Sequence, residues 1–179
     1  MIFTETSIVG AYVIEPEPAS DDRGLFARTF DAEEFSRRGM DGRVSQCNTS
    51  VNRRVGTLRG LHYQVAPHGE AKLVRCTRGA IYDVAVDLRA ESPTYLRWFG
   101  AELTGENRHA FFIPDGCAHG FQTLAEDSEI LYQMSTPYVP GSGAGVRWDD
   151  PAFGIRWPDP PPGGRIMSER DAEYPDFAA

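Results

Sequence analysis

The sequence has no long apolar run, no basic cluster and no closely spaced cysteine pair, and each absence excludes a class of protein. No apolar segment approaches the roughly 20 residues of a membrane-spanning helix, and the first residues lack the pattern of a signal peptide. A net charge of −8 argues against nucleic-acid binding. Cys47, Cys76 and Cys117 are scattered and odd in number. They indicate reduced thiols and predict a cytoplasmic protein.

Short strands dominate the pattern along the chain. The 179 residues, 41% of them hydrophobic, fit one domain spanning 1–179 with no internal repeat or linker. Strand-like segments recur every 8–12 residues between turn sequences, which predicts an all-β sandwich, barrel or jelly roll. The convincing helix is 31–40, with Asp31 as N-cap and Gly39 just past its end. The segment SERDAEY near the end could form one short helical turn.

The stretch from Gly56 to Arg89 organises the rest of the chain. It predicts three strands, at 57–65, 71–76 and 80–88. His62 and Lys72 are equally distant from Pro67 in the first linker. If the first two strands form a symmetric hairpin, these side chains face each other with Cβ atoms about 5 Å apart. A base beside a cation favours catalysis over packing, although a one-residue slip of register would separate the two.

The third of these strands carries an apolar face and an acidic face. Tyr82, Val84 and Val86 fall on the first, whereas Asp83 and Asp87 fall on the second. The acidic face is exposed either to water or to a polar cavity. Because His62 and Lys72 are predicted on neighbouring strands, Asp83 favours a cavity.

The segment PDGCAHGF at 114–121 is the second informative stretch. Its Pro-x-Gly-x-x-His spacing, ending at His119, resembles the second motif of cupin jelly rolls. Many cupins bind metal through a His-x-His pair, an acid and this later histidine, but RGLHYQ supplies His62 alone. No metal is therefore expected. His119 is either an interior histidine, for which Asp83 is the candidate partner, or a residue that contacts substrate directly.

Several segments taken together resemble one enzyme family. RGLHYQ, EAKLVRCTRGAIYDVAVDLRAESPT, IPDGCAHGF, EILYQMSTPYVP and SERD are similar to the dTDP-4-dehydrorhamnose 3,5-epimerase family, from residue 21 to Asp171. The resemblance implies a double-stranded β-helix of the cupin type, a homodimer, and no cofactor. It also implies a substrate in which a 4-keto-6-deoxyhexose is attached to a nucleoside diphosphate.

The resemblance implies four catalytic roles. His62 matches the family's base, and Asp171 matches the carboxylate that orients it. Lys72 matches the cation that stabilises the enolate, and Tyr132 matches the acid that returns a proton from the opposite face. These roles suit the reaction, since protons beside a C4 ketone are acidic and their removal places charge on the ketone oxygen.

The resemblance also implies a set of substrate-binding residues: Arg23, Phe26, Gln46, Asn48, Arg59, His119 and Tyr138. Arg23 and Arg59 fit pyrophosphate, which a guanidinium fork recognises well. Arg59 and His62 cannot share one face of a regular strand, so either the strand is distorted or Arg59 reaches round its edge. Arg28 stands where the family usually has a glutamate near the nucleobase, so thymidine is a default.

Other functions are compatible with the same residues. An enzyme that epimerises C3 alone, or a ketoisomerase, would use the same histidine and tyrosine. A non-catalytic sugar-binding cupin would have no use for an acid on the face opposite the base, which argues against it. A metal-dependent cupin oxygenase is disfavoured by the missing His-x-His pair.

Overall fold

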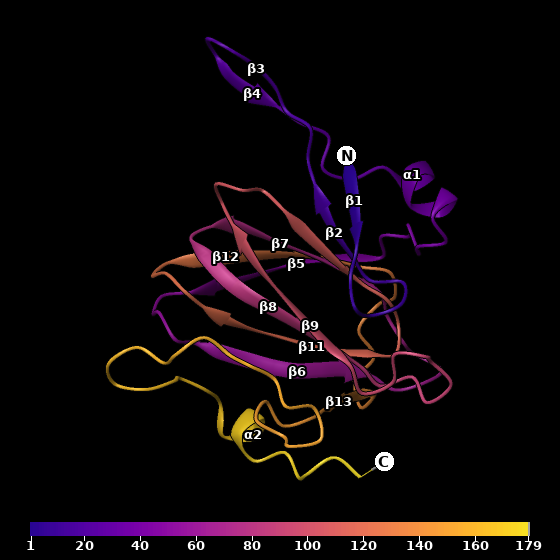
Figure 1. Cartoon of the computed structure of the whole chain (residues 1–179), viewed down its shortest axis with the longest axis vertical. Coiled ribbons are helices and arrows are strands. Elements are labelled where there is room, and N and C mark those ends of the chain that lie inside the picture. Colours follow the sequence, from indigo (N-terminus) through magenta and orange to yellow (C-terminus); the bar gives the residue numbers. More distant parts are fainter. Residues whose placement is uncertain (179) are drawn as a thin grey trace.

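Two antiparallel sheets face each other in the computed structural model, which describes residues 1–178 (Figure 1). The larger sheet has the order β1-β2-β10-β7-β12-β5, the smaller β13-β6-β11-β8-β9, and β3-β4 form a separate hairpin. The strands are β1 Ile2–Glu5, β2 Tyr12–Glu15, β3 Ala19–Asp21, β4 Gly24–Phe26, β5 Gln46–Asn52, β6 Leu58–Gln64, β7 Lys72–Arg78, β8 Ala80–Asp87, β9 Trp98–Thr104, β10 Ala110–Ile113, β11 Cys117–Thr123, β12 Ser128–Met134 and β13 Gly143–Gly145. The predicted all-β jelly roll is confirmed.

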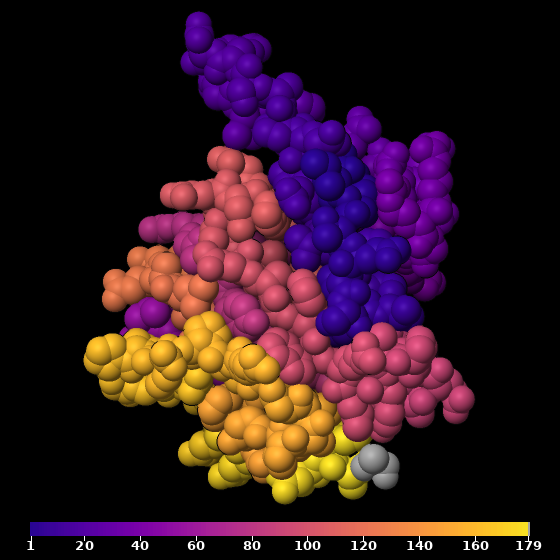
Figure 2. Space-filling model, viewed as in Figure 1, coloured from indigo at the N-terminus to yellow at the C-terminus, as the bar shows by residue number. Residues whose placement is uncertain are grey.

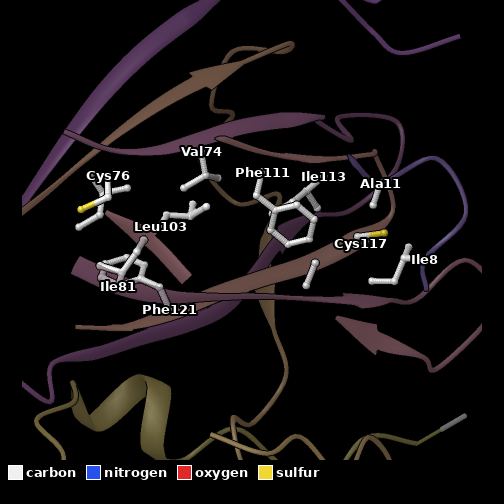
Figure 3. Packing of buried hydrophobic residues seen from close by; sticks show 12 residues of the cluster. Ile8, Ala11, Val74, Cys76, Ile81, Leu103, Phe111, Ile113, Cys117 and Phe121 are labelled. Carbon is white, nitrogen blue, oxygen red and sulfur yellow. The ribbon is translucent and has the colours of Figure 1, made fainter. Parts of the chain in front are cut away.

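Apolar side chains from both sheets fill the space between them (Figure 3). Val74 of β7 and Phe111 of β10 come from the larger sheet, and Ile81 of β8 and Phe121 of β11 from the smaller. All four are at most 1% exposed. Burying one such side chain contributes roughly 1.5–3 kcal/mol, so this layer fixes the two sheets against each other and gives the site rigid walls.

The first helix forms where the sequence predicts it. Helix α1 spans Ala32–Arg37, and the Asp31 carboxylate accepts hydrogen bonds from the backbone N–H groups of Glu33 and Glu34. Gly39 follows with a φ of +71°, a left-handed conformation that favours glycine. The short helix α2, Glu169–Ala172, also forms, within the predicted SERDAEY segment.

The predicted hairpin between β6 and β7 is wrong. Strand β6 pairs with β11 and β13 in the smaller sheet, whereas β7 pairs with β10 and β12 in the larger. The seven residues between them carry the chain from one sheet to the other. His62 and Lys72 still meet, but across the interior of the jelly roll and not as partners on one sheet face.

Both faces of β8 are buried. Ile81 and Ala85 lie in the core between the sheets, whereas Val84 and Val86 pack against the carboxy-terminal segment around Phe153. The face predicted to be acidic is therefore largely a core face. Asp83 is 0% exposed and lies in the interior, so its predicted placement in a cavity wall is not observed.

Two segments whose sequences are typical of strands, LFARTF at 25–30 and GIRWP at 154–158, depart from that prediction. The segment 154–158 forms no strand, whereas the glycine-rich β13, which was not predicted, pairs with β6. In the region 25–30, only residues up to Phe26 are in a strand. The β3-β4 hairpin extends away from the two sheets and forms a sheet of its own (Figures 1 and 2).

Candidate active site

A cavity of about 440 Å³ opens between the two sheets. Strands β5, β6, β7, β11 and β12 and the segment around α2 contribute to its walls. The lining residues are Asn48, Arg59, His62, Lys72, His119, Phe121, Tyr132, Met134, Ser168, Arg170 and Asp171. All four residues for which a catalytic role is predicted therefore line one cavity.

His62 and Asp171 form a hydrogen-bonded pair across 109 residues of sequence. The Nε2 atom of His62 lies 2.8 Å from Oδ1 of Asp171. The second carboxylate oxygen accepts from the backbone N–H of Gly60 at 3.2 Å. Burial works to raise the pKa of Asp171, but the bonds from His62 and Gly60 hold it below its usual value. An ionised carboxylate fixes the orientation of the His62 ring and stabilises its protonated form.

A distortion of β6 brings Arg59 and His62 to the same cavity. The register between β6 and β11 shifts between His119 and Phe121, and Gly60 has a φ of +118°. A side chain at Gly60 would place a Cβ atom 2.5 Å from Cα of Gly120. Of the two predicted explanations for Arg59, a distorted strand is therefore the one observed.

Lys72 is a buried amine at the edge of the cavity. Its side chain is 7% exposed, and its Nζ donates to the backbone carbonyl of His62 at 3.0 Å. The Oε1 atom of Glu70 lies 3.2 Å from the same nitrogen. Burial lowers the pKa of Lys72, and the charge and hydrogen bond of Glu70 oppose that effect.

His119 is paired with Asp83 inside the molecule. Its Nε2 lies 2.7 Å from Oδ1 of Asp83, so the interior pairing predicted as one of two alternatives is confirmed. Burial raises the pKa of Asp83, whereas His119 and Lys72 act in the opposite direction. Because His119 also lines the cavity, pairing does not remove it from contact with a bound molecule.

Tyr132 reaches the cavity from the sheet that faces His62. It belongs to β12 of the larger sheet, whereas His62 belongs to β6 of the smaller. Its ring centroid lies 6.0 Å from that of His119. Burial raises the pKa of the Tyr132 phenol above its usual value, so the group is a protonated acid at neutral pH. A base and an acid thus approach one cavity from two sides.

Comparison with known proteins identifies the family. The profile of the dTDP-4-dehydrorhamnose 3,5-epimerase family matches residues 5–179. The chain is 43% identical over 177 residues to the dTDP-4-dehydrorhamnose 3,5-epimerase of Sinorhizobium fredii, covering 99% of this chain and 90% of that protein. The chain belongs to this family.

Two further family members define the extent of the likeness. The crystal structure of dTDP-4-dehydrorhamnose 3,5-epimerase from Elizabethkingia anophelis superposes with a TM-score of 0.94 at 38% identity, covering 99% of this chain and 96% of that one. The dTDP-4-dehydrorhamnose 3-epimerase of Streptomyces niveus is 38% identical over 167 residues, covering 93% of this chain and 79% of that protein. The relatives of this chain thus include enzymes named for inversion at one centre and enzymes named for inversion at two.

Four residues predicted to bind substrate lie outside the cavity wall. Arg23 and Phe26 belong to the protruding β3-β4 hairpin (Figure 2), where the Phe26 side chain is 79% exposed. Gln46 pairs with Met134 of the cavity wall, and its Oε1 accepts from the backbone N–H of Tyr138 at 2.8 Å. Tyr138 is 60% exposed. Asn48, Arg59 and His119, in contrast, line the cavity as predicted.

Sequence reasoning missed several residues around the site. Ser168 caps α2 by accepting from the backbone N–H of Asp171 at 3.1 Å, and the serine that begins SERD is a sequence signal for such a cap. Arg170 lines the cavity from the same helix. Glu70 lies two residues before Lys72. In a strand this spacing places two side chains on one face, so the sequence offered a signal that Glu70 and Lys72 are neighbours.

The described part of the chain shows neither a metal cluster nor a membrane-spanning helix. Within residues 1–178, no group of three or more His, Cys, Asp and Glu side chains is arranged to hold a metal ion. No helix among these residues is long and apolar enough to cross a membrane.

Proposed function

We propose that the chain is an isomerase that epimerises a dTDP-4-keto-6-deoxyhexose at C3 and C5. The observation that carries the proposal is the placement of His62 and Tyr132 on facing sheets, with both side chains in one cavity and Lys72 between the sheets. Family membership supports the nature of the substrate. A binding module would have no use for a base and an acid on opposite sides of its ligand.

The reaction follows from the chemistry of a ketone. His62 removes the proton from the carbon beside C4, and the electrons of the broken C–H bond pass to the ketone oxygen to form an enolate. The Lys72 ammonium stabilises the negative charge on that oxygen. Tyr132 then donates a proton to the same carbon from the opposite face, which inverts the centre. Exchange with water returns His62 and Tyr132 to their starting states.

Asp171 has a positioning role in this scheme. Its carboxylate holds the Nε2 atom of His62 at 2.8 Å, so the other ring nitrogen is the one available for proton transfer. The negative charge also stabilises the imidazolium that forms when His62 accepts a proton. The bond from Gly60 keeps the carboxylate in place at the point where β6 is distorted.

The nucleoside diphosphate is proposed to bind beside the sugar. Arg59 and Asn48 in the cavity wall offer donors for its phosphate oxygens. Gln46 and Tyr138 are proposed to extend this surface. Arg28 stands where the family usually has an acid. It is exposed and paired with Asp31 at 3.0 Å. Thymidine is kept as the default base of the substrate.

A homodimer and a cytoplasmic location complete the proposal. Arg23 and Phe26 can bind substrate only if their hairpin meets a site other than the cavity wall of its own chain, and a second copy would provide one. The exposed Leu25 and Phe26 support such a contact, since they are consecutive apolar residues on strand β4 of the hairpin. Size-exclusion chromatography with light scattering would detect the dimer, and a monomer of full activity would contradict it.

The test is proton exchange in heavy water. The protein is incubated with dTDP-4-keto-6-deoxyglucose in D₂O, and NMR follows deuterium at C3 and C5. We expect incorporation and inversion at both carbons, with His109→Ala, a histidine outside the cavity, as an active control. Incorporation at C3 alone would identify a 3-epimerase. Absence of incorporation while the nucleotide still binds would overturn the proposed reaction.

A further inference from the structure

Lys72 is the only lysine in the sequence, and every other basic side chain except histidine is an arginine. The chain thus places its single primary side-chain amine in the candidate active site, where burial disfavours charge. The proposed enolate needs a charged ammonium at this point. The structure shows which group opposes the effect of burial: Glu70, whose side chain is only 7% exposed.

Both carboxylate oxygens of Glu70 face hydrogen-bond donors. Oε1 lies 3.2 Å from Nζ of Lys72, and Oε2 accepts from Nε2 of Gln64 at 3.0 Å. Gln64 and Lys72 are 5% and 6% exposed, so water does not substitute readily for either bond. Position 70 therefore needs a side chain that accepts a hydrogen bond at both of its terminal atoms, as a carboxylate does.

The orientation of the Gln64 amide is fixed by its other bonds. Its Oε1 accepts from the backbone N–H of Val139 at 2.8 Å and from the hydroxyl of Ser142 at 2.7 Å. Its Nε2 also donates to the backbone carbonyl of His68 at 3.0 Å. If the amide were turned over, its N–H groups would face the N–H of Val139, and its oxygen would face the carbonyl of His68 and the carboxylate of Glu70. Gln64 therefore presents N–H to Glu70, and a neutral amide at position 70 would lose one of its two bonds.

The bonds of Lys72 leave one donor for the cavity. A lysine ammonium has three N–H groups. One donates to the backbone carbonyl of His62 at 3.0 Å, and one faces Glu70. The third remains for a molecule in the cavity, which Lys72 lines. Because the other two bonds fix the nitrogen, the third N–H has a defined direction.

We propose that Glu70 is a positioning residue that keeps the single lysine of the chain charged and directs its free N–H toward the substrate oxygen, with Gln64 holding Glu70 in place. The identity of that oxygen rests on the proposed function. The state of the amine does not, since it follows from the contacts of Lys72 alone.

The other charged and titratable groups around Lys72 cannot replace Glu70. Asp83 acts on it in the same direction, but more weakly and with its own oxygen bonded to His119. Cys117 has its thiol pKa raised to about 12 by burial, so it carries no charge at neutral pH. The remaining groups that line the same cavity are Arg59, His62, Tyr132, Arg170 and Asp171. Asp171 is the one carboxylate among them, and its two oxygens are bonded to His62 and to the backbone N–H of Gly60.

The test is the titration of Lys72 itself. Protein grown with ¹³C,¹⁵N-lysine gives one lysine side-chain NMR signal, whose position is followed from pH 6 upward without substrate. Glu70→Gln removes the charge with little change of volume. Since a neighbouring opposite charge moves a pKa by about 1–3 pH units, we expect the midpoint to fall by at least about one pH unit. Glu102→Gln, an equal change of charge on the exposed face of β9, should leave the midpoint unchanged.

Activity provides a second measurement that a merely structural role would not change. The alkaline limb of the exchange rate should move to lower pH in Glu70→Gln. At a pH above both midpoints, a midpoint lower by one pH unit leaves about tenfold less of the charged amine. Glu70→Asp, which restores the charge, should return the midpoint toward the wild-type value. An equal midpoint in Glu70→Gln and wild type would overturn the inference.

The wild-type protein alone also tests the inference, independently of whether the variants fold. A lysine signal that is neutral at pH 7 would overturn it. If the wild-type protein exchanges no deuterium into the sugar, the proposed reaction fails, whereas a lowered midpoint in Glu70→Gln still supports the role of Glu70. The two failures are therefore distinguishable.

Discussion

Replacing Tyr132 by Phe should separate proton removal from inversion. The substitution removes only the hydroxyl, which is the proposed acid. His62 would still remove a proton, and Lys72 would still hold the enolate. The enolate could then take a proton back only from the face that His62 occupies, where the imidazolium exchanges its own proton with water. Deuterium should enter the sugar while its configuration stays the same.

The expected effect on inversion is large, and the expected effect on folding is small. General acid catalysis contributes about 10²–10⁴-fold, so inversion should fall by that factor, with exchange from the His62 side within about tenfold of wild type. The ring of Tyr132 packs against the core and lies 6.0 Å from the His119 ring. Phe keeps these contacts, and loss of one hydroxyl hydrogen bond costs only about 0.5–1.5 kcal/mol. Unfolding would therefore not explain a lost activity.

The assay is NMR in D₂O with dTDP-4-keto-6-deoxyglucose, because one spectrum reports both exchange and configuration. Tyr82→Phe is the matched control, since that tyrosine packs against Trp157 with ring centroids 6.4 Å apart and does not line the cavity. Inversion of both centres at the wild-type rate in Tyr132→Phe would show that Tyr132 serves packing alone. Tyr138, near the cavity, would then be the next candidate for the acid.

Four other outcomes are expected from the same structure. His62→Ala should reduce deuterium exchange at C3 and C5 by at least about 10²–10⁴-fold while nucleotide binding, measured by calorimetry, persists; wild-type exchange would mean that the base is misassigned. Exhaustive treatment with EDTA should leave the exchange rate unchanged, and inactivation rescued by one divalent metal would place the protein among the metal-dependent cupins. Iodoacetamide at pH 7 should modify the exposed Cys47 and spare Cys76 and Cys117, since burial raises the pKa of their thiols to about 11 and about 12; mass spectrometry of the peptides would show any exception. Finally, burial works to raise the pKa of Asp87, but hydrogen bonds from Arg89, Ser92 and Thr94 lower it to about 2. The contribution of the Asp87 carboxylate to folding stability is therefore complete above about pH 4 and is lost as the pH falls through about 2. Asp87→Asn should cost about 1.5–3 kcal/mol at pH 7 and flatten that acid dependence in urea titrations.

The local parts of the fold could be predicted from sequence because their causes are local. Asp31 and Gly39 bracket helix α1, and their capping chemistry acts within a few residues. The strands β6, β7 and β8 lie within two residues of their predicted bounds. Strand β13 was missed because its glycines carry no pattern of alternation, and pairing with β6 alone defines it.

The identity of the candidate catalytic residues also came from the sequence. His62, Lys72, Tyr132 and Asp171 were assigned through segments that resemble one family, and the structure places all four around one cavity. What the local pattern suggested for His62 and Lys72, a shared sheet face, was wrong, since their strands belong to different sheets.

The tertiary structure decided which distant groups meet. A strand pattern records which residues alternate, but it does not record which sheet receives the strand or which partner lies opposite. Strand β11 is buried along its whole length, so its sequence gives no face to assign. The contact of His62 with Asp171 joins residues 109 positions apart, and the bond of Glu70 to Gln64 depends on a linker that crosses between the sheets. Such contacts arise from packing between segments that are distant in sequence, so the sequence of one short segment does not predict them.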